Sequence, residues 1–365
     1  MPAELPSPDL APPSFAEARS RRIVLLADDL TGASDAGAAF LRAGHSVRVW
    51  FGTSVQFSAP ESVQAFNTNS RQLSPGRAAH VVAQATGALG SDPNSLFFKK
   101  VDSAARGPFA AEILAAHRAM KTRAVLLAPA FPSAGRTVRE GILEIEDATG
   151  EQKQVDLRRL FPLTARGRII NITSPSELEP AMDSGKSILI CETTTQADLE
   201  SLVRVADKLP GLLYAGSAGL AQALARLDSA RITPALLPSV SRILLVTGSA
   251  HPATKLQLED LNPDRFDGLS VLRISGHLFA KRRIRSRFKS FTPDALILTG
   301  GETAMLAVQA LEANSFILQG ELAAGIPWGL VQGGAAHGCT VVTKSGGFGS
   351  PTVFTDILRA FRGPA

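Results

Sequence analysis

Short apolar runs alternate with helix-like spacings along most of the chain, and the first such unit lies near its N-terminus. Residues 22–27 are largely apolar and include two successive β-branched residues, which predicts a buried strand. From Ala33 onward, apolar positions such as Ala36 and Phe40 are three or four residues apart, which predicts a helix. Between the two lie Asp28, Asp29, Thr31 and Gly32. The stretch therefore predicts the carboxyl end of a parallel strand, where open α/β sheets bind ligands.

The same alternation continues through the N-terminal half. Strands are predicted at residues 46–51, 62–66, 95–103, 124–128, 168–171, 187–191 and 212–215, and helices at 75–89, 110–121 and, after a small-residue turn, up to 227. Strands that alternate with helices predict an α/β fold with a mostly parallel, doubly wound sheet. The polar segment 140–158 interrupts this pattern and predicts a hairpin or another excursion from the sheet.

The C-terminal half repeats the pattern after a linker that contains Pro234 and Pro238. Strands that end in polar turns are predicted at residues 242–249, 295–303 and 341–350, with helices starting near 254 and at 304. A chain of 365 residues exceeds one ordinary core, so the sequence predicts two α/β domains. We place a flexible leader at residues 1–21, an N-terminal domain at 22–233 and a C-terminal domain at 241–359.

The composition is that of a globular protein, with 45% hydrophobic and 19% charged residues. No apolar stretch approaches the ~20 residues of a membrane span, and the leader lacks the apolar segment of a secretory signal. Cys191 and Cys339 lie beside apolar runs without metal-binding spacing, so we expect reduced core thiols. We therefore expect a cytoplasmic protein without a membrane partner.

The net charge is +5, and the basic residues are scattered except for a cluster at residues 281–287. Because this cluster has no interleaved aromatic residues, a solvated helix face is favoured over a nucleic-acid site. Anionic small molecules fit the charge balance, so we expect such ligands and no nucleic acid.

Polar residues follow four predicted strands of the N-terminal half, at positions 28–29, 70–71, 99–103 and 135–136. Because the carboxyl ends of parallel strands meet at one edge of a sheet, these tips are predicted to surround a single ligand. Arg71, Lys100 and Arg136 suit a carboxylate or phosphate, Arg through paired hydrogen bonds and Lys as a point charge. Taken singly, each of these residues could instead belong to a solvated loop.

The adjacent carboxylates Asp28 and Asp29 are more than a helix cap needs, since one Asp suffices. One of them is therefore expected to face the ligand, with Asp28 favoured, while the other supports the turn. A carboxylate within hydrogen-bond reach of a hydroxyl can orient or deprotonate it. The sequence leaves Asp28 and Asp102 as alternatives for this catalytic role.

Glycine and hydroxyl residues follow three predicted strands of the C-terminal half, at positions 247–249, 300–303 and 345–349. Glycine lets the backbone approach a phosphate closely, and helix N-terminal amides favour negative charge. Each turn alone is equally compatible with plain turn geometry, but three together predict a nucleotide site that lacks a P-loop and a dinucleotide fingerprint. Glu302 could help to hold Mg²⁺ or act only as a helix N-terminal carboxylate. The two halves together predict phosphoryl transfer from ATP, with Mg²⁺ shared by the phosphates.

Several motifs resemble those of the four-carbon acid sugar kinases, a family once described only as a domain of unknown function. They lie in family order at residues 27–35, 70–71, 100–107, 129–137, 216–220, 300–303 and 344–349. The resemblance implies ATP-dependent phosphorylation of the terminal hydroxyl of a tetronate or 3-oxo-tetronate, such as threonate or erythronate. It also implies an N-terminal sugar-acid domain and a C-terminal ATP domain.

The strand tips and the resemblance together define two sets of candidate residues. Those for the sugar acid are Asp28, Asp29, Arg71, Lys100, Asp102, Ser103 and Arg136. Those for ATP are Ser249, Gly300, Gly301, Glu302, Thr303, Gly346 and Gly347. The metal ligands stay open, and a homo-oligomer is compatible with the sequence.

The chain departs from the family pattern at a few positions, which are Asn67, Ala104, Ala105 and Pro108 in the substrate half and His251 in a nucleotide turn. These changes bear on the identity of the acid more than on the kinase class. The alternatives are a family member that only senses a sugar acid or nucleotide, a kinase for a different hydroxy-carboxylate, and a dinucleotide-dependent dehydrogenase.

Overall fold

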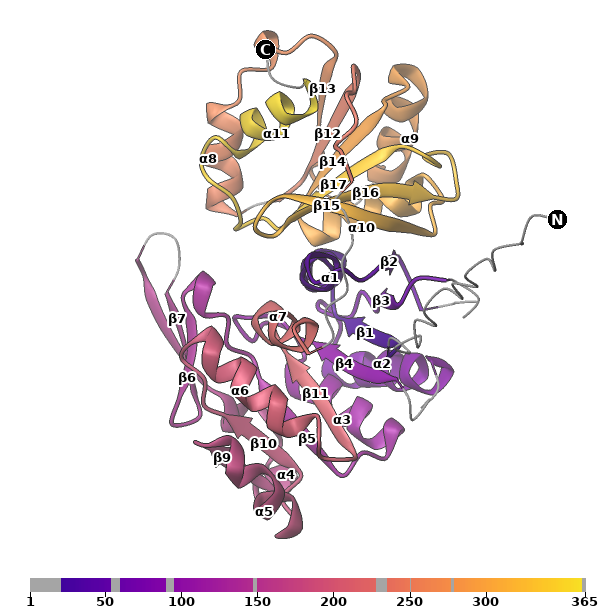
Figure 1. Ribbon diagram of the computed structural model, residues 1–365. Coiled ribbons are helices and arrows are strands. Elements are labelled where there is room, and N and C mark those ends of the chain that lie inside the picture. Colours follow the sequence, from indigo (N-terminus) through magenta and orange to yellow (C-terminus); the bar gives the residue numbers. More distant parts are fainter. Residues whose placement is uncertain are drawn as a thin grey trace, which may run out of the picture.

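The structure is a computed structural model that describes residues 21–53, 60–89, 95–146, 150–227, 235–249, 251–276 and 279–362. The predicted leader, apart from Arg21, and Pro234 of the predicted linker lie outside these ranges. Within them the protein is mixed α/β, with helices on both faces of a long, mostly parallel sheet (Figure 1). None of the described helices is long and apolar enough to cross a bilayer.

The N-terminal half contributes neighbouring strands that all run parallel, in the order β2-β3-β1-β4-β11-β5-β10-β9. They are β1 (Ile23–Ala27), β2 (Val47–Trp50), β3 (Val63–Asn67), β4 (Leu96–Lys100), β5 (Ala124–Ala128), β9 (Ile169–Ile172), β10 (Ile188–Cys191) and β11 (Leu212–Gly216). The strands are rich in apolar residues because helices cover both faces of the sheet. The predicted doubly wound sheet is confirmed.

The helices of this half divide between the two faces of the sheet. One face packs against α1 (Leu30–Arg42), α5 (Leu178–Asp183), α6 (Gln196–Ala206) and α7 (Ala218–Ala225). The other face packs against α2 (Pro75–Leu89), α3 (Phe109–Met120) and α4 (Leu163–Arg166). The helix predicted at residues 75–89 has the bounds of α2.

The polar segment predicted as a hairpin or excursion is a separate antiparallel sheet. Its strands are β6 (Arg136–Arg139), β7 (Ile142–Glu146) and β8 (Gln152–Asp156). Figure 1 shows β6 and β7 beside the main sheet, and an isolated bridge between Val138 and Thr193 attaches them to it. Arg136, which was expected at a strand end of the main sheet, is therefore the first residue of this small sheet.

The C-terminal half contains the second predicted α/β unit. Its parallel strands, in the order β13-β12-β14-β17, are β12 (Ile243–Thr247), β13 (Leu269–Arg273), β14 (Ala295–Thr299) and β17 (Thr340–Lys344). One face packs against α9 (Ala280–Phe291) and α10 (Gly301–Ala310), and the other against α8 (Pro252–Asp260) and α11 (Val353–Arg362). α11 was not predicted from the sequence, although most of it lies within the predicted C-terminal domain.

An antiparallel hairpin that the sequence reading did not predict joins the two halves. β15 (Ser315–Ala323) pairs with β16 (Ile326–Gln332) and, on its other side, with β2, while β16 pairs with β17. The result is one 14-stranded sheet in which β17 runs opposite to β2. Six neighbouring pairs separate β14 from β1, so a twist of about 20–25° per pair rotates one half by roughly 120–150° against the other. This rotation lets the carboxyl ends of both sets of strands face each other.

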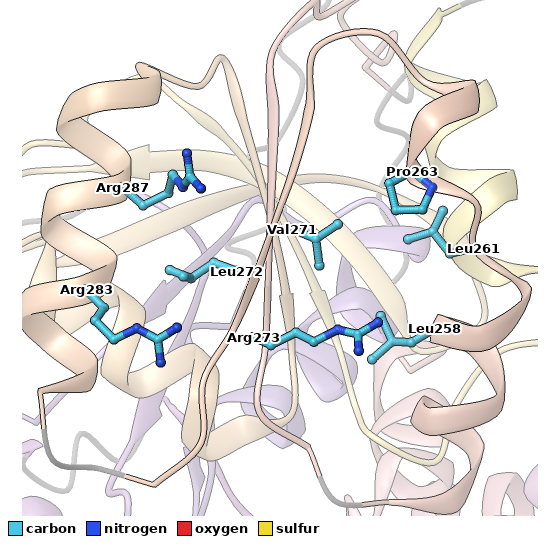
Figure 2. Close-up of a pocket in the computed structure, with 8 residues that line it drawn as sticks. All are labelled: Leu258, Leu261, Pro263, Val271, Leu272, Arg273, Arg283 and Arg287. Carbon is cyan, nitrogen blue, oxygen red and sulfur yellow. The ribbon is translucent and has the colours of Figure 1, made fainter.

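The far edge of the C-terminal half is β13, with α9 beside it (Figure 2). The basic cluster at residues 281–287 lies on α9, where Ile284 is buried and the charged residues are exposed, so the predicted solvated helix face is confirmed. A cavity of about 340 Å³ lies around β13 and is lined by Arg273, Arg283 and Arg287. Its other lining residues are Leu258, Leu261, Pro263, Val271 and Leu272. No residue of the glycine turns lines it.

Candidate active site at the facing strand ends

Three of the four predicted polar tips lie side by side, because β3, β1 and β4 are neighbours in the sheet. The tips hold Asp28 and Asp29 after β1, Ser70 and Arg71 after β3, and Lys100 and Asp102 at the end of β4. The backbone fixes two of these tips to each other, since the amides of Ser70 and Arg71 donate to the Asp28 carbonyl at 2.9 and 3.3 Å.

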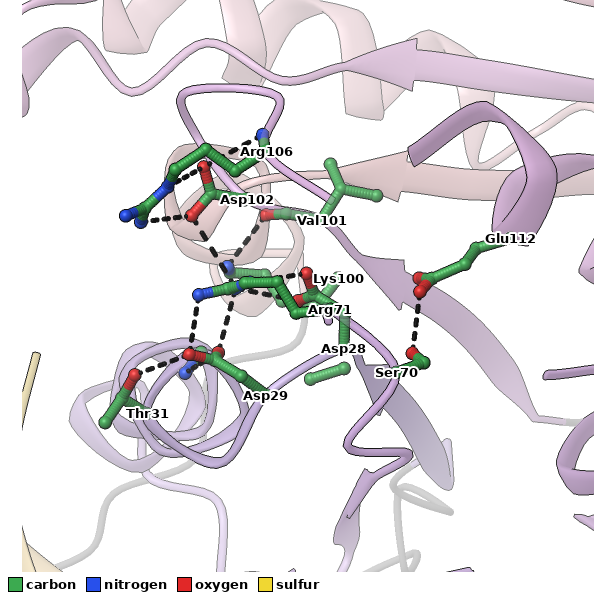
Figure 3. Close-up of polar contacts among 12 residues, drawn as sticks. Asp28, Asp29, Thr31, Ser70, Arg71, Lys100, Val101, Asp102, Arg106 and Glu112 are labelled. Carbon is green, nitrogen blue, oxygen red and sulfur yellow. Dashed lines mark hydrogen bonds and ion pairs between the residues drawn. The ribbon is translucent and has the colours of Figure 1, made fainter. Parts of the chain in front are cut away.

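Arg71 is the centre of this polar cluster (Figure 3). Its Nε and Nη2 donate to the two carboxylate oxygens of Asp28 at 2.8 and 2.9 Å. Its Nη1 and Nη2 donate to Asp29 at 2.6 and 2.9 Å. The Oδ2 of Asp102 lies 3.6 Å from Nη2. One guanidinium, with its side chain only 16% exposed, is thus shared by three carboxylates.

Asp102 has a second cationic partner, Arg106. The Nε and Nη2 of Arg106 donate to the two carboxylate oxygens at 2.9 and 2.6 Å, and the Ala104 amide donates to Oδ1 at 2.9 Å. Arg106 is 59% exposed, so it binds Asp102 from the solvent side while Arg71 approaches from within. Arg106 belongs to a motif of the family resemblance but was not among the predicted site residues.

The cations determine the charge state of the cluster. Burial opposes ionisation of Asp28, but Arg71 outweighs it and holds the pKa of that carboxyl below its ordinary value. Burial likewise opposes ionisation of Asp102, and there the hydrogen bonds of Arg106 and the charge of Arg71 lower the pKa. In return, Asp28 and Asp29 raise the pKa of Arg71 although burial acts in the other direction. Asp28, Asp102 and Arg71 are therefore all charged at neutral pH.

Asp29 also caps α1. Its Oδ1 accepts the Gly32 amide at 2.7 Å, and its Oδ2 accepts the Thr31 hydroxyl at 2.9 Å. A Cβ on Gly32 would lie 2.6 Å from Oδ1 of Asp29, so glycine is needed for this close approach. Asp29 thus has the turn-supporting role that was predicted for one of the two adjacent carboxylates.

A buried ion pair lies directly behind the Arg71 turn. The Nζ of Lys99 lies 2.8 Å from Oε2 of Glu112, and the two side chains are 0% and 2% exposed. The Ser70 hydroxyl donates to the other oxygen of Glu112 at 2.6 Å and so fixes the turn to the pair. Because either charge alone would be strongly unfavourable in this place, each requires the other. Lys99 was predicted only as part of the polar tip at residues 99–103, and Glu112 was not predicted, since nothing in the spacing of α3 indicates its partner.

The three glycine turns of the C-terminal half also meet, because β12, β14 and β17 are neighbours. A Cβ on Gly346 would lie 2.6 Å from Oγ of Ser249, and one on Gly248 would lie 2.7 Å from Oγ1 of Thr303. Gly300, with a φ of +89°, packs against Ser249. The helices that follow β12 and β14 cover opposite faces of the sheet, so these turns lie at the switch point where open α/β sheets bind ligands.

The glycine turns adjoin the carboxylate cluster where the two halves meet. A Cβ on Gly301 would lie 2.7 Å from Oδ2 of Asp29 and 3.4 Å from Oγ1 of Thr31. The side-chain nitrogen of Asn67 lies 2.9 Å from Sδ of Met305 on α10. The N-terminus of α10 therefore abuts the acidic turn after β1, and first-turn amides of a helix attract anions.

The remaining candidates are placed less centrally. Ser103 lies in the loop after β4, Glu302 in the first turn of α10, and Gly347 in the loop after β17. The guanidinium of Arg136 donates to the Ala134 carbonyl in the loop before β6. The ligand-binding roles of these four residues stay predictions.

Two departures from the family pattern have clear local roles. The Nδ1 of His251 accepts the Ala253 amide at 3.2 Å and caps α8. The side-chain oxygen of Asn67 accepts the Asn69 amide at 2.8 Å and shapes the turn before Arg71. Both side chains therefore support turns of the site.

No group of three or more metal-binding side chains occurs in the described part of the chain. In phosphoryl transfer, Mg²⁺ is held largely by substrate phosphates and only one or two carboxylates. The exposed Glu302, beside the N-terminus of α10, is a carboxylate of the kind that such a site uses. The residues present therefore fit Mg²⁺ that arrives with a nucleotide.

Comparison with known proteins agrees with this division of the site. A family model described as a sugar-binding N-terminal domain matches residues 23–224, and one described as a nucleotide-binding C-terminal domain matches residues 279–354. The chain is 29% identical to a D-threonate kinase of Bordetella bronchiseptica, over 93% of this chain and 97% of that protein. It is 27% identical to a D-erythronate kinase of Heliobacterium modesticaldum, over 65% of this chain and 59% of that protein. A solved Haemophilus influenzae structure has the same fold, with a TM-score of 0.69, 20% identity and coverage of 91% and 98%.

Proposed function

The chain belongs to the four-carbon acid sugar kinase family, and on this premise we propose that it transfers the γ-phosphate of ATP to the terminal hydroxyl of a four-carbon sugar acid. D-Threonate and D-erythronate, the acids named for two relatives, are the first acceptors to test. We propose residues 22–233 as the sugar-acid domain and 241–359 as the ATP domain. A tetronate carries one carboxylate and several hydroxyls, which matches a cluster of side chains of both charges.

The observation that carries this proposal is the contact between Gly301 and Asp29. It joins the first turn of α10 in the nucleotide half to the acidic turn in the sugar half. Phosphoryl transfer needs the attacking oxygen and the γ-phosphate in line and close together, and it needs little covalent chemistry from the protein. An acceptor site at the acidic turn and a phosphate site at the N-terminus of α10 would be close enough for this transfer.

The acceptor side would bind the acid through its cations. Arg71 and Lys100 would hold the carboxylate or its neighbouring hydroxyls, after the guanidinium gives up part of its pairing with the Asp side chains. Asp28 or Asp102 would accept a hydrogen bond from the attacking hydroxyl and orient it. Because the transition state is loose, an ionised carboxylate with a lowered pKa can still serve, since orientation matters more than basicity.

The nucleotide side would hold the phosphates with backbone amides at Gly300, Gly301 and Gly346 and with the hydroxyls of Ser249 and Thr303. Mg²⁺, when bound, would supply neutralisation of the charge on the transferred phosphoryl group. Glu302 would hold that ion directly or through water. The exposed position of Glu302 leaves it accessible to a metal–nucleotide complex.

The test is an ADP-release assay with ATP, Mg²⁺ and a panel of D-threonate, L-threonate, D-erythronate and a 3-oxo-tetronate. ADP should form with at least one of these acids, and the product should be a phosphomonoester of the terminal hydroxyl. Lactate, which has the carboxylate and a 2-hydroxyl but no terminal hydroxyl, is the matched control and should give no ADP. Asp28→Asn and Asp102→Asn, compared at saturating ATP, identify the carboxylate that orients the hydroxyl, since its loss should lower kcat more.

Lack of ADP formation with every acid would overturn the kinase proposal. Calorimetric binding of an acid or of ADP, without turnover, would then favour the sensor alternative. Turnover with a longer or shorter hydroxy-carboxylate alone would retain the kinase and correct the acceptor.

A further inference from the structure

The loop after β17, residues 345–350, has most of its carbonyl groups directed into the protein. The ammonium of Lys344 donates to the carbonyls of Ser345 and Phe348 at 2.9 and 3.0 Å. The carbonyl oxygen of Gly346 lies 3.4 Å from the same ammonium. Lys344 is 0% exposed. The strand end therefore carries a buried cation whose partners are the carbonyls of the loop that follows it.

Two neutral side chains of α8 bind the same carbonyls. The hydroxyl of Thr254 donates to the Gly346 carbonyl at 2.8 Å. The amide nitrogen of Gln257 lies 3.1, 3.0 and 3.1 Å from the carbonyls of Phe348, Gly349 and Ser350. Thr254 and Gln257 are 0% and 2% exposed. Together with Lys344 they form the carbonyl-binding group of this loop.

The planarity of the peptide bond then fixes the direction of the amides. In a trans peptide the carbonyl of one residue and the N–H of the next point in opposite directions. Since the carbonyls of residues 345, 346, 348 and 349 point inward, the N–H groups of Gly346, Gly347, Gly349 and Ser350 must point outward. The N–H of Phe348, which follows the Gly347 carbonyl, instead donates to the Ser345 carbonyl at 3.2 Å. Successive outward amides form a concavity that binds anions.

The loop borders the other two nucleotide turns. A Cβ on Gly346 would lie 2.6 Å from Oγ of Ser249. A Cβ on Gly347 would lie 3.0 Å from Nε2 of His251. Side chains larger than glycine at these places would therefore fill the space between the turns. The loop therefore lies beside Ser249, which also packs against Gly300 at the N-terminus of α10.

Lys344 has no acidic partner in the described part of the chain, where no carboxylate lies within 4.0 Å of its Nζ. The ring of Phe354 on α11 lies 5.5 Å from the ammonium. Burial lowers the pKa of Lys344 to about 8. A buried, unpaired cation is unfavourable for folding, which points to a function for its charge.

We propose that Lys344 is a positioning residue for the nucleotide, which with Thr254 and Gln257 turns the loop carbonyls inward so that the loop amides cradle a polyphosphate. The positive charge beneath the loop strengthens the attraction for phosphate. This inference rests on the proposed use of ATP, and it assigns a role to three residues that contact the loop rather than the ligand.

Calorimetric titration with ADP as the probe tests this role without turnover. Lys344→Met should weaken ADP binding at least about tenfold, since charge-assisted hydrogen bonds to the loop are lost. The double variant Lys99→Met with Glu112→Leu, which removes the other fully buried lysine together with its partner, is the matched control and should bind ADP within about twofold of the wild type. In the assay, Lys344→Met should raise KM for ATP and leave KM for the acid unchanged.

ADP binding by folded Lys344→Met within about twofold of the wild type would overturn the inference. If this variant does not fold, the double variant Thr254→Val, Gln257→Leu decides, with about a tenfold loss of affinity expected. Absence of turnover with every acid would overturn the proposed function alone, because the binding comparison would still stand. Absence of ADP binding by the wild type would overturn both.

The pH dependence of ADP binding separates a charge effect from a merely structural one. Wild-type affinity should fall above about pH 8, as Lys344 loses its proton, and the affinity of Lys344→Met should lack this fall. His251 is the titratable side chain that faces the loop from α8, and Phe354 from α11 is uncharged. His251→Asn should therefore keep the fall above pH 8. A wild-type affinity that stays level from pH 7 to 10 would overturn the role of the charge.

Discussion

The proposed site has two sides, here called the acceptor wall and the nucleotide wall. Both consist of polar turns that follow parallel strands, but different chemical groups line them. The acceptor wall consists of Asp28, Asp29, Arg71, Lys100 and Asp102. In it Arg71 pairs with the three Asp side chains, and the ammonium of Lys100 donates to the Val101 carbonyl at 2.8 Å. The nucleotide wall, residues 247–249, 300–303 and 345–350, presents glycine and hydroxyl residues that allow close approach of the backbone. A small acid can be recognised by individual side chains, whereas a polyphosphate suits converging amides.

A fully buried lysine also lies behind each wall, and the comparison between these two lysines is the most informative one. Lys99 and Lys344 are both 0% exposed. Lys99 is paired with Glu112, so that region is electrically balanced, whereas Lys344 binds only carbonyls. The acceptor wall is thus held by paired opposite charges, and the nucleotide wall by a net positive charge beneath its amides. With the proposed function, an anionic nucleotide would complete the charge balance of the nucleotide wall.

The largest expected effect comes from removing the centre of the acceptor wall. Arg71→Met leaves three buried carboxylates without their shared partner, so the free energy of unfolding should fall by about 3–5 kcal/mol. The kcat/KM for the acid should fall about 100- to 1000-fold. Denaturant unfolding and steady-state kinetics measure the two changes.

Arg71→Lys is the matched control, because it keeps a charge but cannot make forked bonds to Asp28 and Asp29 together. Its activity and stability should lie between those of the wild type and Arg71→Met. The affinity for ADP should stay within about twofold in both variants, since the nucleotide wall has its own binding groups. A large loss of ADP affinity in Arg71→Met would break the division into two walls.

The second prediction concerns the ion pair behind the acceptor wall. Glu112→Gln leaves Lys99 buried without a carboxylate, so the protein should lose about 3 kcal/mol of stability. Replacing both residues by apolar ones, Lys99→Met with Glu112→Leu, should recover much of that loss, because no buried charge remains. The Ser70 hydroxyl still loses its acceptor, so KM for the acid should stay raised about threefold to tenfold in the double variant.

Chemical denaturation measures the stability of Glu112→Gln and of the double variant, and steady-state kinetics measures their KM for the acid. Together the two measurements separate an effect on stability from an effect on the position of the Arg71 turn. If the double variant recovered both stability and KM, the ion pair would have no role in holding the Arg71 turn. If KM for ATP rose as well, the pair would act on both walls.

Much of the fold follows from local patterns, which is why sequence reasoning reaches it. The apolar run before Asp28 and the helical spacing after it require only neighbours in sequence, and the strand tips follow from the rule for parallel sheets. The hairpin of β15 and β16 was missed because its pairing with β2 joins segments more than 250 residues apart. A local pattern contains no information about such a partner, so the continuous sheet could not be predicted.

The same limit applies to the site. Arg71 and Asp102 were predicted because charged residues at successive strand ends converge by topology. Glu112 and Lys344 were not, since their roles depend on the atoms that burial places around them. Arg136 shows the converse error, because a charged residue several positions after β5 was counted as a tip although it begins a separate sheet.

The third prediction sharpens the contrast between the two lysines through stability. The pKa of Lys344 is about 8 in the folded protein and near 10.5 for an ordinary lysine. Between these values the unfolded chain binds more protons, so stability should rise with pH from about 8 to 10.5, by about 3 kcal/mol. Thermal unfolding across this range should show the rise in the wild type and lack it in Lys344→Met. ADP affinity should fall over the same pH range. A rise in stability together with a fall in ADP affinity would show that the charge of Lys344 is unfavourable for folding and favourable for binding.

The smallest effect we predict concerns Asp35 on α1, where acceptor-wall charges and the joining hairpin come together. Burial raises the pKa of Asp35 to about 6, and among its neighbours Lys100 lowers that pKa while Glu321 of β15 raises it. Because the folded pKa lies above the ordinary value of 3.8, the folded state binds more protons between the two, and stability falls as pH rises through this window. The full pKa shift corresponds to about 3 kcal/mol, but Asp35 is only partly buried, so Asp35→Asn should be more stable than the wild type by about 1 kcal/mol at pH 7. Below about pH 4 the two proteins should be equally stable. If the carboxylate serves the acceptor wall through Lys100, the same variant should lose activity toward the acid while it gains stability, and unchanged activity would place Asp35 outside that wall.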